Sequence, residues 1–243
     1  MKALVFSKRN LKEIVRDPLS LIFGVGLPII MLCLFCVISS SVDNMPSMFG
    51  ASEMAPSMAA FGLSFLTLFL SLLMANDNNN SFLTRLLASP MKTSDFILGY
   101  ALPMLPLALA QSILCLAVGA AFGMKINIYT LPTLLALMAA SLFFISIGLL
   151  FGSIFSPTQV GGISSIVINA FALLSGTWIP IKTIKGGFAV FCSILPFEHI
   201  LDLVKDTSAG SFENLLKNLL WTLVSSAIIF VAAAFVFTKK HRR

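Results

Sequence analysis

Residues 126–181 read INIYTLPTLLALMAASLFFISIGLLFGSIFSPTQVGGISSIVINAFALLSGTWIPI and contain no Asp, Glu, Lys or Arg. A helix needs about 20 apolar residues to cross a bilayer, so this run is too long for one spanning helix. Ser156 and Pro157 interrupt it, and a proline disfavours helix at the residue before it and lacks a backbone N–H. We therefore predict two spans, at about 130–155 and 160–181, joined by a tight turn.

The rest of the chain contains four further uncharged stretches, each long enough for one spanning helix. They predict spans at about 19–41, 57–76, 96–122 and 217–238. A shorter run, 186–197, is too short to cross as a helix, so we expect a re-entrant or interfacial segment that packs against the bundle. The predicted fold is an all-α membrane protein with six transmembrane helices in one domain, 1–243.

The composition excludes an ordinary soluble protein. Hydrophobic residues make up 58% of the chain and charged residues only 11%, whereas a soluble domain carries about a quarter charged residues. The net charge of +6 is explained by membrane topology and by contact with anionic membrane lipid, so we expect no nucleic-acid partner.

Basic residues gather on one side of the predicted topology. With six spans both termini lie on that side, together with the connection after the second span. Its basic residues are Lys2, Lys8, Arg9, Lys12, Arg16, Arg85, Lys92, Lys239, Lys240, Arg242 and Arg243, against Lys125, Lys182, Lys185, Lys205 and Lys217 on the other side. The positive-inside rule therefore predicts that both termini are cytoplasmic.

Two amphipathic segments are predicted on the cytoplasmic side. In 1–17, an apolar face of Leu4, Leu11, Ile14 and Val15 opposes a basic face of Lys8, Arg9, Lys12 and Arg16, which favours a helix lying in the membrane interface with its cations toward lipid headgroups. Residues 81–90, SFLTRLLASP, form a second short helix with Arg85 as its one charge. This second helix is either an ordinary connection or a docking surface for a soluble partner, since an exposed apolar helix favours being covered.

Glycine pairs and prolines mark special positions within the spans. Gly119 and Gly123, and also Gly148 and Gly152, are spaced one helical turn apart and let helix backbones approach closely, either within the chain or between two copies. Pro28 is expected to kink the first span, and Pro103 and Pro106 are expected to bend the third span near its cytoplasmic end.

Little in the sequence points to chemistry carried out by this chain alone. There is no phosphate-binding loop of the GxxxxGK[ST] type, so we expect no ATP hydrolysis here. Cys33 and Cys36 have CxxC spacing but lie in an apolar span, where cysteine acts as a small hydrophobe. The one acidic and histidine cluster contains Glu198, His199 and Asp202. A structural role is the default for it, a membrane-embedded enzyme is the alternative, and we expect no metal site.

The spans carry almost no ionisable residues. Carriers that couple transport to protons or ions usually place such residues in mid-membrane. Apolar, amphiphilic or lipid-linked cargo moved by an external energy source is therefore favoured over a stand-alone channel or carrier, which stays as the main alternative, ahead of the membrane-embedded enzyme.

Several motifs occur in an order that resembles a known family. They are Arg16-Asp17-Pro18, Pro28, Leu86-Leu87-Ala88-Ser89-Pro90, Gly99-Tyr100, Leu174-Ser175-Gly176-Thr177-Trp178-Ile179-Pro180 and Leu195-Pro196-Phe197. Over nearly its whole length the chain resembles the membrane subunits of type-2 ABC transporters, the exporters that include drug-resistance permeases. It departs from the family pattern ahead of Leu86, where family members usually carry an acidic residue followed by Arg and a Gly-Thr pair. Asp77 stands in place of the acid here, and the Gly is absent.

The resemblance implies a permease domain that exports an amphiphilic substrate, such as a drug, an antimicrobial peptide or a lipid-linked compound, across a bacterial plasma membrane. It implies pairing with a second copy or a paralogous permease, and with ABC ATP-binding subunits that supply ATP and Mg²⁺, no cofactor being held by this chain. The implied coupling helix contains Phe82, Arg85, Leu86, Leu87, Ser89 and Pro90, with Lys8, Arg9, Lys12 and Arg16 of the interfacial helix beside it. The implied outer re-entrant segment includes Pro196, Phe197, Glu198 and His199.

Overall fold

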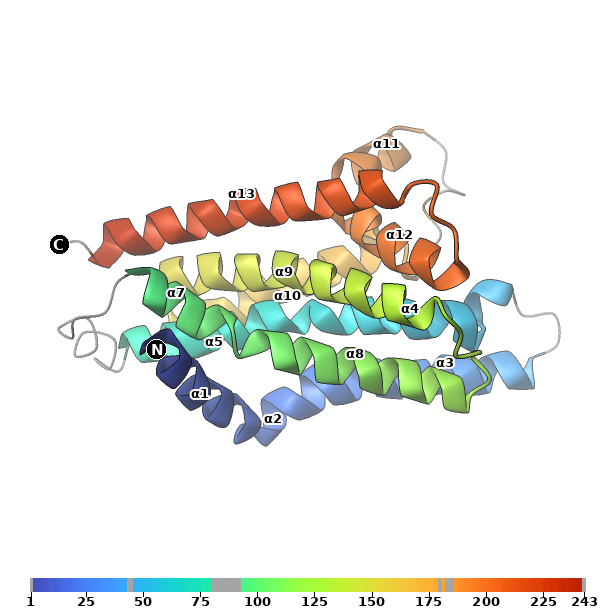
Figure 1. The fold of residues 1–243 in the computed structure, drawn as a ribbon, viewed down its shortest axis with the longest axis horizontal. Coiled ribbons are helices and arrows are strands. Elements are labelled where there is room, and N and C mark those ends of the chain that lie inside the picture. Colours follow the sequence, from blue (N-terminus) through green and yellow to red (C-terminus); the bar gives the residue numbers. More distant parts are fainter. Residues whose placement is uncertain (1, 43–45, 80–92, 179–180, 182–185, 242–243) are drawn as a thin grey trace.

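The computed structural model describes residues 2–42, 46–79, 93–178, 181 and 186–241, and within these residues it is helical with no strand. Long helices lie side by side in one bundle, and α1 (Lys2–Val15) begins at the same end of it at which α13 (Leu215–His241) ends (Figure 1). We call this the basic end of the bundle. Six candidate membrane spans are found in the described residues, which confirms the predicted all-α membrane fold. They are Ile22–Ser41, Ala51–Asn79, Thr93–Ala121, Thr130–Ile154, Pro157–Leu174 and Leu215–Lys240.

The long uncharged run is divided where the sequence predicts. α9 (Thr130–Ile154) ends before Ser156, and α10 (Pro157–Leu174) begins directly after it. The Ser156 backbone is extended at φ −79° and ψ 161°, and its N–H donates to Oε1 of Gln159 over 3.1 Å in a capping box. Helix α10 ends at Leu174 rather than near residue 181.

The prolines interrupt two spans, each in a different way. Ahead of Pro28 the chain forms α2 (Pro18–Leu21) and a π-helical segment, η1 (Ile22–Gly26), before α3 (Leu27–Ser41). The N–H of Leu27 donates to Ile22 O, so the wider turn accommodates the proline. The third span is broken at Leu102 and Pro103, between α7 (Thr93–Ala101) and α8 (Met104–Ala121).

The second span is longer than predicted and lies at the centre of the bundle. A short 3₁₀ turn, η2 (Ser47–Phe49), precedes α4 (Ala51–Leu63), and α5 (Phe65–Asn79) follows after a break at Ser64. The predicted start of this span at about residue 57 is therefore six residues too late. Glu53 lies in the first turn of α4, where a carboxylate is stabilised by the helix dipole, so its charge does not mark a loop.

Glycines set the closest helix contacts inside the chain. A Cβ added at Gly119 of α8 would lie 2.3 Å from the Cβ of Ala55 in α4. A Cβ added at Gly152 of α9 would lie 2.8 Å from the Cβ of Met74 in α5, and one at Gly148 would lie 3.0 Å from the Cβ of Leu70. These three glycines therefore serve packing within the chain.

Two shorter helices close the end of the bundle opposite the basic end. α11 (Gly187–Ile194) and α12 (Pro196–Ala209) are bent by 78° relative to each other at Leu195. Helix α12 packs against α13, α9 and α4 (Figure 1). It ends at Gly210, which has φ +75° and occupies the left-handed conformation that glycine adopts readily at a helix C-terminus.

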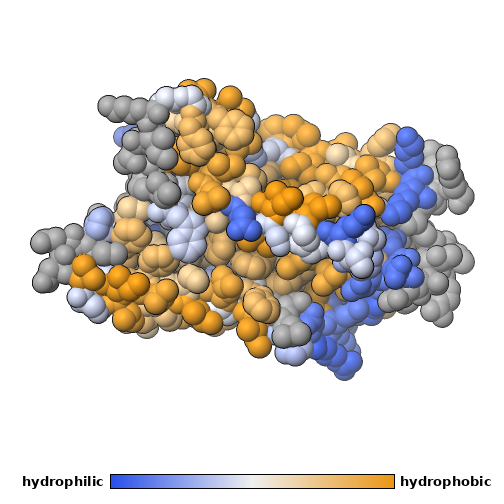
Figure 2. Space-filling model, turned by 180° about the vertical axis from the view of Figure 1, so that it is seen from behind, coloured by the Kyte–Doolittle hydropathy of each residue, from blue (hydrophilic) through white to orange (hydrophobic). Residues whose placement is uncertain are grey.

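Surface polarity follows this arrangement. Hydrophobic side chains cover the flank of the bundle, and hydrophilic ones gather toward the basic end (Figure 2). This distribution is the one expected of a protein whose long helices lie in lipid while one end meets headgroups and water.

Candidate coupling site

A partly buried ion pair joins α1 to the basic end of α5. The Arg9 guanidinium donates to both carboxylate oxygens of Asp77, over 2.6 Å to Oδ2 and 3.0 Å to Oδ1. The Asp77 side chain is only 5% exposed, and that of Arg9 is 37% exposed. Such a two-point contact fixes the orientation of both groups as well as the distance between them.

Helix α7 completes the same cluster. The Tyr100 hydroxyl donates to Oδ2 of Asp77 over 2.9 Å, and the amide of Asn10 donates to the carbonyl of Gly99 over 3.0 Å. Phe6 packs edge-on against the Tyr100 ring, with ring centroids 4.9 Å apart. A Cβ at Gly99 would lie 2.2 Å from Phe6, so the glycine permits this close contact.

We call Arg9, Asn10, Asp77 and Tyr100 the Arg9–Asp77 cluster. Burial lowers the pKa of the Arg9 guanidinium, but the hydrogen bonds and charge of Asp77, together with Glu13 at 2.7 Å, raise its pKa above the usual value. Arg9 therefore stays charged at every physiological pH. Since a buried carboxylate is costly without a partner, the pair holds α1 strongly in place.

The cluster lies beside the connection between the second and third spans. Helix α5 ends at Asn79 and α7 begins at Thr93, so the two helices flank the connection formed by residues 80–92. The predicted coupling residues Phe82, Arg85, Leu86, Leu87, Ser89 and Pro90 lie in this connection, outside the described residues. Through Asp77 and Tyr100, the cluster attaches both flanking helices to α1.

Comparison with protein families gives one result. A family model described as ABC-2 type transporter matches residues 2–208. The chain belongs to the ABC-2 type transporter family. No curated protein matches the chain. Members of this family are the membrane components of ABC transporters, so the chain is a multi-pass transporter subunit and not itself an enzyme.

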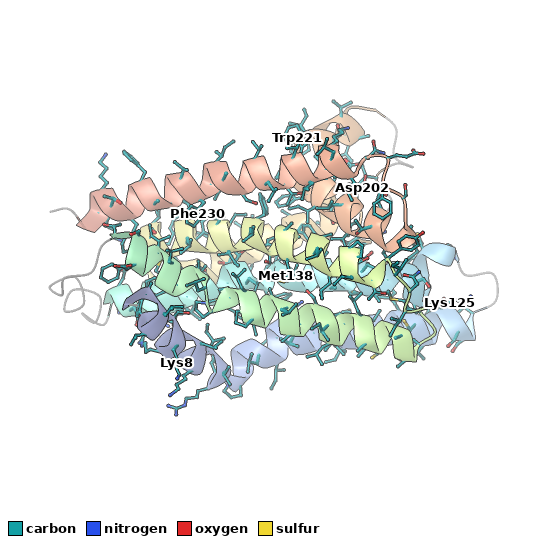
Figure 3. The ribbon with its side chains drawn as sticks, viewed as in Figure 1. Lys8, Lys125, Met138, Asp202, Trp221 and Phe230 are labelled. Carbon is teal, nitrogen blue, oxygen red and sulfur yellow. The ribbon has the colours of Figure 1, made fainter. Side chains whose placement is uncertain are left out.

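In this ABC-2 chain, α1, which was predicted to be an interfacial helix, is not divided simply into an apolar and a basic face. Lys8, Lys12 and Arg16 are exposed, and Lys8 points away from the bundle (Figure 3). Arg9 differs, because its guanidinium turns inward to Asp77. Of the predicted apolar face, only Ile14 is buried, whereas Leu4 and Val15 are 65% and 59% exposed.

The residues predicted for the opposite end do not form one site. The buried His199 ring stacks on Trp221, with centroids 5.1 Å apart, and its Nδ1 and Nε2 lie 3.0 Å from Asn218 Oδ1 and 3.1 Å from Ser193 O. Glu198 and Asp202 instead line a small cavity of about 110 Å³. His199 therefore has a structural role between α12 and α13, as do Pro196, which opens α12, and Phe197, which packs on Phe143 and Phe171.

No group of three His, Cys, Asp or Glu side chains in the described part of the chain could hold a metal ion. Cys33 and Cys36 are free thiols. Among the polar residues of the described chain, those of the Arg9–Asp77 cluster form the site that we consider for function.

Sequence reasoning found part of this cluster. The sequence motifs include Asp77, as the acid ahead of Leu86, and the pair Gly99-Tyr100. They do not indicate that these residues contact Arg9 or Asn10. Asn10 shares a helical face with Phe6 and Ile14, and this polar residue on a buried face is the signal that could have indicated a packed surface.

Proposed function

We propose that the chain is the transmembrane subunit of an ABC exporter that moves an amphiphilic substrate out of the cell. ATP and Mg²⁺ are bound by a separate subunit, which docks on residues 81–90. The observation that carries this proposal is the Arg9–Asp77 cluster, because it connects both helices flanking this segment to α1. The basic end faces the cytoplasm of a bacterial plasma membrane, in agreement with the positive-inside rule.

The proposed mechanism uses the breaks in the spans. ATP binding closes the partner subunits and displaces the docked segment, and α1, α5 and α7 move together because the cluster joins them. The π-helical segment Ile22–Gly26 and the break at Leu102 and Pro103 are positions where regular helical hydrogen bonds are already missing. Bending there is therefore less costly than in a regular helix.

The position of charged residues in the spans supports an amphiphilic substrate. In the described spans, the charged residues Glu53, Asp77, Asp95, Lys217, Lys239 and Lys240 all lie near a span end. No charged side chain is thus offered in mid-membrane by the described residues. Transport of an amphiphile with a large apolar part needs none, whereas coupling to a proton or ion gradient usually does.

The partner can be tested by co-purification with an ABC ATP-binding protein in mild detergent. We expect a stable complex, and the double change Leu86→Ala and Leu87→Ala should weaken it by removing apolar contact area. The matched control, Leu131→Ala and Leu135→Ala, removes equally large side chains that are 65% and 63% exposed on α9.

A cross-link from Ser89→Cys to the partner should stop transport. Substrate flux in proteoliposomes without any ATPase would contradict the proposal and favour a stand-alone carrier.

We further propose that two copies pair through α10. Its exposed face carries Gln159, Gly162, Ser165 and Asn169. A line of hydrophilic surface crosses the otherwise hydrophobic flank in the region of α10 (Figure 2). Polar side chains facing hydrocarbon are unfavourable, while small and polar residues are favoured where spanning helices meet. A second copy, or a paralogous permease, would cover this face.

Cysteine cross-linking tests this pairing. We expect Ser165→Cys to give a disulfide-linked dimer in native membranes, because the exposed face of α10 would meet its symmetry mate. Ile228→Cys is the control, since Ile228 is 65% exposed on α13, away from α10. Equal cross-linking at both positions, or none at Ser165→Cys and at the neighbouring Asn169→Cys, would rule out this interface.

A further inference from the structure

The His199 side chain lies where α11, α12 and α13 meet, and the residue is only 6% exposed. Its Nδ1 lies 3.0 Å from Asn218 Oδ1 on α13, and its Nε2 lies 3.1 Å from Ser193 O on α11. One face of the ring stacks on Trp221, with the two rings 8° from parallel. Trp221 lies near the end of α13 beside which α11 and α12 are found (Figure 3). The imidazole ring therefore connects three helices.

The orientation of the Asn218 amide follows from its other neighbour. Its Nδ2 lies 3.5 Å from Oδ2 of Asp206, and the reverse orientation would place an amide oxygen against a carboxylate oxygen. Oδ1 of Asn218 therefore faces the His199 ring. Because Ser193 O is a backbone carbonyl, both ring nitrogens face oxygen atoms that can only accept a hydrogen bond.

Only an imidazolium ring satisfies both contacts at once. Neutral imidazole carries one N–H, whereas the imidazolium form carries two. The face of the Trp221 ring also favours a cation. So does Ser193, because it lies in the last turn of α11 (Gly187–Ile194), where the carbonyl groups form the negative end of the helix dipole. Burial disfavours the charge of His199, and these contacts offset that cost.

Helix α11 is the element that such a contact can hold or release. Among the described helices it packs mainly against α12, whereas α13 packs along α9 as well as α12. When the His199 ring is neutral, one nitrogen lone pair faces an oxygen atom, which is unfavourable. Because α13 is fixed by its other contacts, the contact that opens is the one from His199 to Ser193 O.

Other titratable groups on the surrounding helices do not take the place of His199. On α12, α11, α13 and α4 they are Glu198, Asp202, Lys205, Asp206, Cys192, Lys217 and Glu53, whereas α9 and α10 carry none. Among the described residues, Asp206 is the one connected to the imidazole, through the Asn218 amide. The charge of His199 itself therefore determines whether both contacts form.

We propose that doubly protonated His199 fastens α11 to α12 and α13, and that loss of one ring proton releases α11. Histidine is the side chain that ordinarily changes its charge between about pH 5 and 8. The two contacts are therefore complete at acidic pH, and one of them is lost as the pH rises. This inference rests on side-chain geometry and not on the proposed transport function. Under the proposed orientation, an acidic exterior holds α11 in place.

The charge of the ring can be measured by nuclear magnetic resonance on the purified full-length chain with 15N-labelled histidine. The chain contains two histidines, so His241→Gln leaves His199 as the single source of signal. We expect both ring nitrogens to be protonated at pH 5 and one at pH 9. Asn218→Leu removes one acceptor and should move this transition to lower pH by about one unit. A ring with the same charge at both pH values would overturn the proposal.

The position of α11 is measured by electron resonance between spin labels at Val190 and Leu216, which are 61% and 67% exposed on α11 and α13. Labels on ketone amino acids leave the native cysteines unchanged. We expect a short, narrow distance distribution at pH 5 and a longer, broader one at pH 9. His199→Gln should give the longer distribution at both pH values. Labels at Leu135 and Ile228, on α9 and α13, are the control pair, whose distance should not depend on pH.

Two outcomes of the distance measurement would contradict the proposal. One is a distance between positions 190 and 216 that is the same at pH 5 and pH 9 in the chain with His199 present, and this result is decisive even if His199→Gln does not fold. The other is a change with pH that persists in His199→Gln, because it would assign the movement of α11 to a different group. Neither measurement depends on a partner subunit or on a substrate, so a failure here would leave the proposed transport function untouched.

Discussion

An Arg9→Ala variant should unfold about 5–10 °C below the unchanged protein when its thermal unfolding is followed in detergent. The Asp77 side chain is 5% exposed beside Arg9, so removing Arg9 leaves a largely buried carboxylate with the Tyr100 hydroxyl as its remaining partner among the described residues. Breaking a buried pair costs about 3–5 kcal/mol, and the partial exposure of Arg9 reduces this to about 2–3 kcal/mol. Asp77→Asn should be milder, because Arg9 can still reach Glu13 and water.

The double variant Arg9→Ala with Asp77→Asn provides the decisive comparison. It removes the cation and the buried negative charge together, so it should be more stable than Arg9→Ala alone. Lys12→Ala is the matched control, since Lys12 is exposed on the same helix, and it should leave the unfolding temperature nearly unchanged. If Arg9→Ala behaves like Lys12→Ala, the cluster does not hold α1 in place.

The same variants separate stability from coupling. In a complex with the proposed ATP-binding subunit, we expect the double variant to support ATP hydrolysis but to transport poorly, because it lacks the two-point contact through which α1 is proposed to move with α5 and α7. Transport by the double variant at the rate of the unchanged protein would show that α1 takes no part in coupling.

Gly119→Val should have the second large effect. Its Cβ would lie 2.3 Å from the Cβ of Ala55, an atom attached directly to the α4 backbone, so the two helices must separate. Overpacking of this kind costs about 3 kcal/mol, and the unfolding temperature should fall by about 6–12 °C.

Gly26→Val is the matched control for this prediction. Gly26 also lies in a spanning segment, but a Cβ there would have only Ile22 nearby, at an ordinary 3.9 Å. Its unfolding temperature should change by no more than about 2 °C. Equal effects of the two substitutions would show that α4 and α8 can adjust, and that Gly119 is not needed for their close approach.

The sequence predicts a feature of the fold correctly where that feature depends on residues close together in the chain. The break at Ser156 is predicted correctly because proline chemistry and the capping box act within a few residues. The start of the second span is predicted six residues too late, because Glu53 is compatible with a loop and with the first turn of a helix. Which of these forms depends on the packing of α4 against α8, α3 and α12.

The role of Arg9 shows the same limit. On a helical wheel it belongs with Lys8, Lys12 and Arg16, and nothing local separates it from them. Its partner lies 68 residues away along the chain, and the bundle alone brings α1 and α5 together. The same holds for Gly119 and Gly148, whose spacing is equally compatible with packing within the chain and between copies.

The long uncharged run and its division at Ser156 and Pro157 were determined by the sequence itself, as were the number of spans, their apolar character and the side that carries the basic residues. These properties follow from hydropathy, charge and proline, each of which acts locally. Only the tertiary structure decided that Arg9 pairs with Asp77 and that Glu198 and His199 face different surroundings. These features depend on contacts between distant residues, and no periodic pattern in a single helix records them.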